Sequence, residues 1–262
     1  MQTALTIAGS DSGGGAGIQA DLKTFHQFGV FGTSVITAIT AQNTRGVESW
    51  EPVSAAMVRA QLDAVIADLP PAAAKSGMLG ARDVVLAVAT GIAEHQLADY
   101  ILDPVMVATS GDILLEPDAV SAVRERLVPL AALVTPNLHE AALLLETQVT
   151  GVDEMADAAE RLVKELGAVA SLVKGGHLRG DTVVDVLYVD GRHIVIENPR
   201  IASSSAHGTG CTLSAAITAK LALGAKLEDA VRSGVRFVQD AMRTAPGLGS
   251  GNGPLNHFAL PS

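Results

Sequence analysis

The feature of this chain that most limits its fold is the alternation of short β-branched segments with segments of helical periodicity. Such alternation is typical of a parallel sheet whose strands are joined by crossover helices. The last two predicted strands flank Asp190-Gly191, a strong turn signal for a hairpin. We therefore expect an α/β fold with a central, mostly parallel sheet flanked by helices and one small β-hairpin. The predicted strands lie at residues 4–8, 34–40, 72–76, 100–104, 132–135, 171–174, 183–189 and 193–197.

Three segments, 54–69, 153–166 and 227–242, repeat apolar residues at helical spacing, which predicts helices with one face on a core. No linker rich in proline, serine or charge divides the chain, and no internal repeat is visible. Residues 1–262 are therefore expected to form a single domain. The glycine-rich segment 246–254 is expected to be a flexible loop.

Charge and composition exclude several classes of function. The net charge is −10 and the basic residues form no run, which argues against a nucleic-acid partner. The chain contains no stretch of about 20 mainly apolar residues, which a membrane span requires. Its first residues lack the basic region of a signal peptide. The lone cysteine, Cys211, cannot form an internal disulfide and is typical of a reducing compartment. A cytoplasmic protein is the expectation.

Familiar nucleotide motifs are absent or incomplete. No glycine is followed by lysine, so the chain has no Walker A loop. Residues 15–20 fit the dinucleotide pattern Gly-x-Gly-x-x-Ala, which calls for an acidic residue at the end of the second strand. That strand leads instead into Gln42-Asn43-Thr44-Arg45, where no carboxylate could hold a ribose. A dinucleotide site is therefore disfavoured, and an anionic ligand must be held by other local devices.

Two glycine-rich segments remain as candidates for such devices. Residues 9–17 contain five glycines in nine positions, more than a tight turn needs, which suits a backbone that closely approaches a ligand. The second segment, His207-Gly208-Thr209-Gly210-Cys211, precedes a helical pattern. The free N–H groups of a helix start form an anion site and favour a thiolate over a thiol. Cys211 is thus either a small buried residue or a reactive group, and its position favours the second.

Together these segments resemble the ribokinase-like superfamily, whose anion hole Gly-x-Gly-Asp lies at a helix start and carries the catalytic base. Here Gly208-Thr209-Gly210-Cys211 has cysteine at the position of that aspartate. This replacement resembles the hydroxymethylpyrimidine/phosphomethylpyrimidine kinase branch of thiamine biosynthesis. Agreement with that branch extends over nearly the whole chain, through segments 5–23, 39–47, 75–79, 103–107, 135–140, 174–177 and 251–258.

The resemblance implies ATP-dependent phosphorylation of hydroxymethylpyrimidine to its monophosphate and then to the diphosphate, by a Mg²⁺-dependent homodimer. In the catalytic centre, Cys211 is expected to accept the hydroxyl proton, beside an anion hole formed by Gly208, Thr209 and Gly210. The residues expected to line the pyrimidine pocket are Gly9, Asp21, Gln42 and Met78. Asn137 and Lys174 are expected to bind ATP, with Glu140 and Asp103 near the metal ion.

Several alternatives stay open at this point. Gln42 could be a plain loop amide, Met78 core filler, and Asp21 a charge on a helix surface. A pyridoxal kinase of the same architecture is the nearest rival function, and a non-catalytic pyrimidine-binding regulatory protein is a more distant one. The chain also departs from the branch at Thr109, where many relatives have lysine, and at Ser205-Ala206, where Asn-Thr is frequent.

Overall fold

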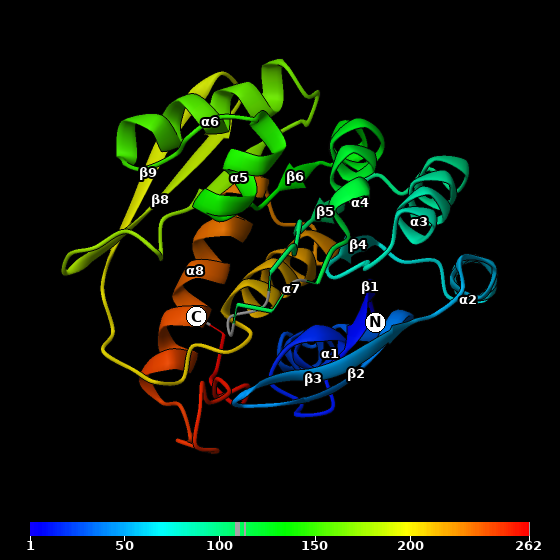
Figure 1. The fold of residues 1–262 in the computed structure, drawn as a ribbon, viewed down its shortest axis with the longest axis horizontal. Coiled ribbons are helices and arrows are strands. Elements are labelled where there is room, and N and C mark those ends of the chain that lie inside the picture. The colour runs from blue at the N-terminus through cyan, green and yellow to red at the C-terminus, as the bar shows by residue number, and fades with distance from the viewer. Residues whose placement is uncertain (108–110, 113, 262) are drawn as a thin grey trace.

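The computed structural model describes residues 1–107, 111–112 and 114–261, and it is built on one nine-stranded sheet (Figure 1). The strand order across the described part of the sheet is β3-β2-β1-β4-β5-β6-β7-β8-β9. The strands are β1 (Thr3–Ser10), β2 (Phe31–Asn43), β3 (Gly46–Pro52), β4 (Ala73–Ser76), β5 (Tyr100–Leu102), β6 (Leu133–Val134), β7 (Ser171–Lys174), β8 (Thr182–Val189) and β9 (Arg192–Pro199).

The centre of the sheet is parallel and its borders are antiparallel. Strands β2, β1, β4, β5, β6 and β7 pair in parallel, while β3 pairs antiparallel with β2, and β8 and β9 continue antiparallel from β7. Asp190 and Gly191 join β8 to β9 with φ values of 51° and 71°, the left-handed pair that a two-residue hairpin turn requires. The predicted α/β fold and its hairpin are confirmed.

Helices cover both faces of the sheet. They are α1 (Gly17–Gln27), α2 (Ala55–Asp68), α3 (Arg82–Glu94), α4 (Pro117–Ala122), α5 (Leu138–Leu145), α6 (Val152–Lys164), α7 (Thr209–Ala222) and α8 (Leu227–Arg243), with two short turns at Val123–Leu127 and Val128–Leu130. Alternate residues of β1 point to opposite faces. Leu5 and Ile7 join a core under α2 to α6, and Ala4 joins a second core under α1, α7 and α8. Among the described residues, none of the helices has the length and apolar character needed to cross a membrane.

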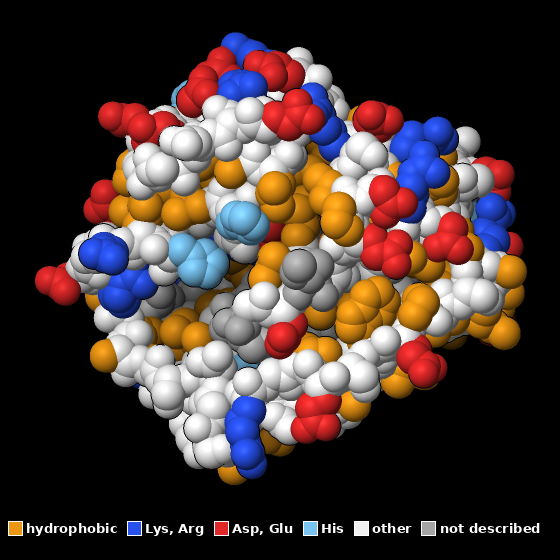
Figure 2. Space-filling model, in the orientation of Figure 1, with side chains coloured by type: hydrophobic (Ala, Val, Ile, Leu, Met, Phe, Trp, Pro, Cys, Tyr) orange, Lys and Arg blue, Asp and Glu red, His pale blue; other side chains and the backbone are white. Residues whose placement is uncertain are grey.

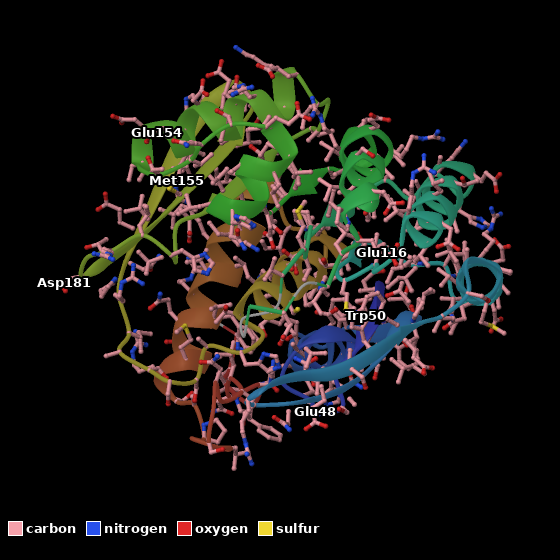
Figure 3. The ribbon with its side chains drawn as sticks, in the orientation of Figure 1. Glu48, Trp50, Glu116, Glu154, Met155 and Asp181 are labelled. Atoms are coloured by element: carbon pink, nitrogen blue, oxygen red, sulfur yellow. The ribbon has the colours of Figure 1, made fainter. Side chains whose placement is uncertain are left out.

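Strand β3 was not predicted from the sequence. Its residues are mostly exposed and include two glutamates, so it lacks the apolar alternation by which strands are recognised. Its turn, Thr44-Arg45, also lacks the usual hairpin residues. Strand β2 accordingly runs to Asn43 instead of ending at residue 40. Trp50 is on β3 (Figure 3). It lies against Gly80, where an added Cβ would come within 2.9 Å of the indole ring.

The segment 246–254 is an irregular loop, as predicted, and its residues 252 and 253 are hydrogen-bonded to two other loops. Backbone hydrogen bonds fasten it at three points: Asn252 N donates to Thr44 O (2.7 Å), Gly253 N donates to Ser204 O (3.1 Å), and His207 N donates to Gly253 O (3.2 Å). The segment therefore joins the β2–β3 turn to the loop that precedes α7.

Candidate active site

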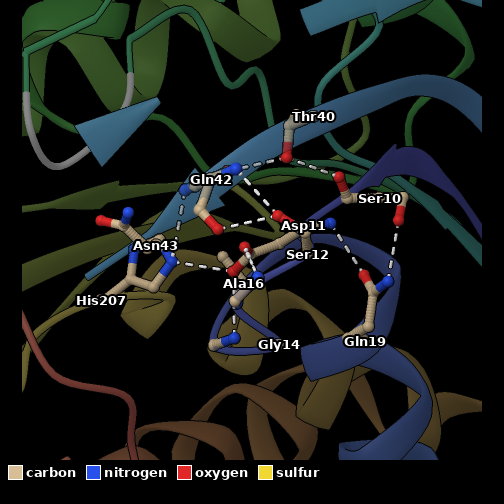
Figure 4. A network of polar contacts seen from close by, with 12 residues as sticks. Ser10, Asp11, Ser12, Gly14, Ala16, Gln19, Thr40, Gln42, Asn43 and His207 are labelled. Atoms are coloured by element: carbon tan, nitrogen blue, oxygen red, sulfur yellow. Dashed lines mark hydrogen bonds and ion pairs between the residues drawn. The ribbon is translucent and has the colours of Figure 1, made fainter. Parts of the chain in front are cut away.

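The carboxylate of Asp11 organises the glycine-rich loop between β1 and α1 (Figure 4). It accepts hydrogen bonds from the backbone N–H groups of Gly13 (2.8 Å), Gly15 (3.0 Å) and Ala16 (2.8 Å), and lies 2.9 Å from His207 Nε2. Burial alone raises the pKa of Asp11, but these hydrogen bonds and the histidine outweigh it and hold the pKa below its ordinary value. The loop is thus a fixed cradle tied to the α7 start.

The second glycine-rich segment forms the start of α7, as predicted. Gly208 is the residue before the helix and has φ +81°, and a Cβ at this position would lie 1.9 Å from Gly15 O. Only glycine allows the two glycine-rich loops to approach so closely. Cys211 lies in the first helical turn, where the N–H groups have no partner within the helix and attract anions.

The helix start is not the largest influence on the pKa of Cys211. Burial raises the pKa of the thiol to about 12, although the positive charge of Lys75 and a hydrogen bond from Gly17 N oppose this rise. Desolvation of the sulfur, which cannot be read from a sequence, exceeds both favourable effects. At neutral pH, Cys211 is therefore a protonated, partly buried thiol.

A cluster of charges faces the α7 start from the neighbouring strand ends. Asp103 follows β5 and accepts hydrogen bonds from Lys174 Nζ (2.9 Å), Thr135 Oγ1 (3.2 Å) and Ser214 Oγ (3.2 Å). Burial alone raises the pKa of Asp103, but the two lysines near it, Lys174 and Lys75, hold it below its ordinary value. The same carboxylate raises the pKa of Lys174 against the effect of burial. Asp103 is ionised and Lys174 is charged.

Asn137 and Glu140 first serve the local structure of α5. Glu140 N donates to Asn137 Oδ1 (3.0 Å) and Asn137 N donates to Glu140 Oε2 (2.8 Å), a complete capping box. The same Glu140 oxygen is 4.0 Å from Lys174 Nζ. Burial raises the pKa of Glu140 to about 7 in spite of the lysine. Both residues thus lie beside the charge cluster.

The anion hole and the charge cluster meet at Gly210. A Cβ placed on Gly210 would be 3.3 Å from Lys174 Nζ and 3.6 Å from Asp103 Oδ2. The backbone of the first turn of α7 and the ammonium group of Lys174 therefore lie close together. The space-filling view shows histidine side chains beside apolar side chains near α5 and α8 on the face turned to the viewer (Figure 2).

The residues expected to line the pyrimidine pocket separate into two environments. Gly9 and Met78 are neighbours, because a Cβ on Gly9 would lie 3.0 Å from Met78 Sδ. Met78 also belongs to a small apolar cluster with Ala38 and Leu114, so packing and pocket lining are compatible. Gln42 lies on β2 and contacts Thr40 and His207, so it is not a plain loop amide.

Asp21 is not a helix-surface charge. Its side chain is fully buried and accepts hydrogen bonds from Lys75 Nζ (2.8 Å) and Thr6 Oγ1 (2.6 Å). Its contact with substrate stays a prediction, since its carboxylate faces these two partners. Thr109 lies outside the described residues.

Sequence reasoning assigned no role to Asp11, Lys75, Ser214 or His207 as a side chain. Two of them left signals. An aspartate two residues before a glycine run is typical of a side chain that caps the following turn. A lysine in the predicted strand around Ala73 and Ala74 requires a buried counter-charge. These two sequence features indicate that Asp11 and Lys75 have interaction partners, but they do not identify the partner residues.

The carboxylates beside Lys174 are suitable ligands for a magnesium ion that binds together with phosphates. Asp103 and Glu140 offer the oxygen ligands that Mg²⁺ prefers, but the ammonium group of Lys174 lies beside both of them. Within the described ranges, no group of three or more His, Cys, Asp and Glu side chains could hold a metal by itself.

Fold and site together define a class of protein. A ligand edge at the carboxyl ends of parallel strands, with a helix-start anion hole opposite a lysine and acidic residues, is that of a ribokinase-like small-molecule kinase. The pattern of the phosphomethylpyrimidine kinase family matches residues 11–256. The chain belongs to that family, which confirms the resemblance and the expectation of an ATP-dependent kinase.

Individual relatives agree with this assignment. The hydroxymethylpyrimidine/phosphomethylpyrimidine kinase of Rhizobium meliloti is 54% identical over 259 residues, covering 97% of this chain and 96% of that protein. An ADP complex of Bacillus subtilis pyridoxal kinase superposes with a TM-score of 0.91 at 40% identity, covering 99% of this chain and 98% of that one. Phosphomethylpyrimidine kinase from Clostridium difficile gives 0.82 at 41% identity, covering 92% and 99%.

Lys174→Met tests the phosphate side of the site. The substitution removes the cation opposite the α7 start and leaves Asp103 buried without its ion-pair partner. We expect kcat/KM for ATP to fall about 100-fold, the size of a lost transition-state charge contact. Stability should fall by about 3 kcal/mol, as for a broken buried pair. Steady-state kinetics with varied ATP and a thermal melt measure the two effects.

Lys164→Met is the matched control, because Lys164 is an exposed lysine paired with Glu160 on the surface of α6. It should leave both the ATP kinetics and the melting temperature almost unchanged. ATP kinetics of Lys174→Met within twofold of the unaltered protein would show that Lys174 does not bind phosphate.

Proposed function

We propose that this chain transfers a phosphoryl group from ATP to the hydroxymethyl oxygen of hydroxymethylpyrimidine, and then phosphorylates the monophosphate to the diphosphate. The observation that carries the proposal is the α7 start, which contains Gly208, Gly210 and Cys211 and where a Cβ on Gly210 would lie 3.3 Å from Lys174 Nζ. Phosphoryl transfer consists mainly of positioning and charge stabilisation, and this arrangement provides both. The relatives named for this activity support the choice of substrate.

In the first step, the N–H groups of the α7 start stabilise the negative charge that develops on the transferring phosphoryl group. Lys174 neutralises phosphate charge from the opposite side. Gln42 hydrogen-bonds the aminopyrimidine, since an amide supplies the donor and the acceptor that this ring edge needs. Gly9 and Met78 form the apolar wall. Mg²⁺ would be held by Asp103 and Glu140, largely through water, and would neutralise phosphate charge.

Cys211 is the candidate acceptor of the hydroxyl proton in the first step. The thiol must be ionised to act, and burial raises its pKa to about 12. The nucleophile of the second step is a phosphate monoester with a second pKa of about 6, which is already anionic and needs little help from a base. The two steps therefore make different demands on one residue.

This difference predicts different pH profiles. Between pH 6.5 and 8.5, the thiolate fraction of a group with a pKa of about 12 increases tenfold per pH unit. We expect kcat/KM for hydroxymethylpyrimidine to rise with the same slope, and kcat/KM for its monophosphate to stay nearly constant above pH 7. Initial rates for each substrate at constant ionic strength measure both profiles. Parallel profiles would exclude a Cys211 base.

A kinase assay with three substrates tests the proposed function. Hydroxymethylpyrimidine and its monophosphate should both be phosphorylated, with the diphosphate as the final product. Pyridoxal is the third substrate, because a solved structure with a TM-score of 0.91 is a pyridoxal kinase. Turnover of pyridoxal alone would overturn the assignment in favour of that activity. ATP consumption without any of the three would contradict both.

The oligomeric state and the cellular location of the chain are also proposals. A homodimer is implied by the resemblance, and a cytoplasmic location by the single cysteine and the sequence composition. Sedimentation of the purified chain measures the first of these, and a tagged chain followed in cell fractions measures the second.

A further inference from the structure

A fully buried ion pair lies behind the α7 start. Lys75 Nζ, on β4, donates a hydrogen bond of 2.8 Å to Asp21 Oδ1, on α1, and both side chains are 0% exposed. Thr6 Oγ1 donates to the second oxygen of Asp21 (2.6 Å). Such a pair contributes little stability compared with apolar residues of the same size. The reaction described above assigns no task to Lys75.

The pair and Cys211 share one region of the interior. The start of α7 lies against the start of α1: a Cβ on Gly208 would be 3.2 Å from the Cα of Ala16, which precedes Gly17, the first residue of α1. Asp21 follows four residues later and therefore lies on the same face of α1, one turn further along. Helix α7 packs on α1 and on β4, which carry Asp21 and Lys75. The ion pair thus lies on the two elements that pack against α7, the helix whose first turn carries Cys211.

Charged groups from four elements act on Cys211. They are Lys75 from β4, Asp21 from α1, Asp103 after β5 and Lys174 at the end of β7. After burial, the largest influence on the pKa of the thiol is Lys75, which lowers it, while Asp21 and Asp103 raise it. Asp103 is already bonded to Lys174. Substitutions at Lys75 and Asp21 can therefore change the charge near the thiol without removing the Asp103–Lys174 ion pair.

We propose that Lys75 is a positioning residue for Cys211: it supplies the counter-cation that a buried Cys211 thiolate needs, and Asp21 holds its ammonium group in place and shares its charge. The inference rests on the proposed function only because that function gives the thiolate a use. The relation among the three side chains belongs to the folded chain itself and is measurable without substrate.

Alkylation by iodoacetamide reports on this relation, because Cys211 is the only cysteine. Asp21→Asn keeps the size of the side chain but leaves the Lys75 ammonium without its carboxylate, so the sulfur becomes the compensating anion. Removing such a charge moves a buried pKa by about two units. Because nucleophilicity falls as the pKa falls, the net gain is about tenfold in alkylation rate at pH 8. The pH–rate curve should move to lower pH.

The control is the double variant Asp21→Asn/Lys75→Met, which removes both charges and leaves no buried ion uncompensated. It should be alkylated no faster than the unaltered protein. A loosened fold would speed up alkylation in both variants, whereas the charge relation predicts opposite results. No acceleration in Asp21→Asn, or equal acceleration in the double variant, would overturn the proposal.

Circular dichroism establishes whether each variant is folded before alkylation. If Asp21→Asn is unfolded, the double variant decides: a rate equal to or below that of the unaltered protein supports the proposal, and a faster rate overturns it. Kinase assays with hydroxymethylpyrimidine are run separately. A chain inactive on that substrate would contradict the proposed function while leaving the alkylation result intact.

Discussion

Cys211→Ala is expected to lower the rate of the first phosphorylation by about 100-fold or more, the contribution of a general base. The second phosphorylation should change by no more than about threefold, because its phosphate nucleophile is already ionised near neutral pH. Alanine is an excellent helix former, so α7 should keep its start at Thr209. Separate assays with hydroxymethylpyrimidine and with its monophosphate measure the two rates.

The ratio of the rate losses in the first and second phosphorylations shows which role Cys211 has. A base at Cys211 acts only where a hydroxyl proton must leave, whereas a packing or anion-hole residue acts in both steps. Equal losses would therefore assign Cys211 to packing or to the anion hole. Thermal melts on the same samples establish that the variant is folded at the assay temperature.

Gly208→Ala is expected to disable both phosphorylations, by about 100-fold or more, because it displaces the anion hole that both transition states use. The added methyl group would lie 1.9 Å from Gly15 O, a backbone atom that cannot rotate away. The φ of +81° at Gly208 adds strain of about 1 kcal/mol for any side chain. Either the Gly9–Gly17 loop or the α7 start must move.

Gly224→Ala is a matched control for this substitution. Gly224 follows the other end of α7 with φ +82°, and no atom lies within 4 Å of its Cβ position. Both variants carry the same conformational strain, but only Gly208→Ala adds the clash. Gly224→Ala should lower the melting temperature slightly and leave both activities unchanged. Equal activity losses in the two variants would show that strain in α7, not displacement of the loop, causes the effect.

The sheet could be predicted because buried parallel strands carry their own signal. Short segments such as residues 4–8 and 171–174 contain apolar and β-branched residues, and both were found as β1 and β7. Strand β3 escaped prediction because an exposed border strand needs little apolar alternation. Strand β3 forms through hydrogen bonds with β2, and its own residue types do not indicate that pairing.

The candidate site was predictable in its backbone and less so in its electrostatics. Glycines and a helix start are local features, so Gly208 and Cys211 were placed correctly. The pKa of Cys211 depends on how many atoms of distant segments surround its sulfur, and burial outweighs the helix start. The Asp21–Lys75 pair joins residues 54 positions apart, and local sequence patterns do not show which distant charges meet.

The hydrogen bonds of the segment 246–254 have a consequence for the order in which the protein is made. Asn252 and Gly253 hold the β2–β3 turn at Thr44 and the loop before α7 at His207. A growing chain emerges from the ribosome with its N-terminal part first. The glycine-rich loop and β2 are therefore present long before the residues that fasten them. Competence to bind substrate should therefore be acquired only after residues 252 and 253 have emerged, so a nascent chain with a complete sheet still lacks a finished site.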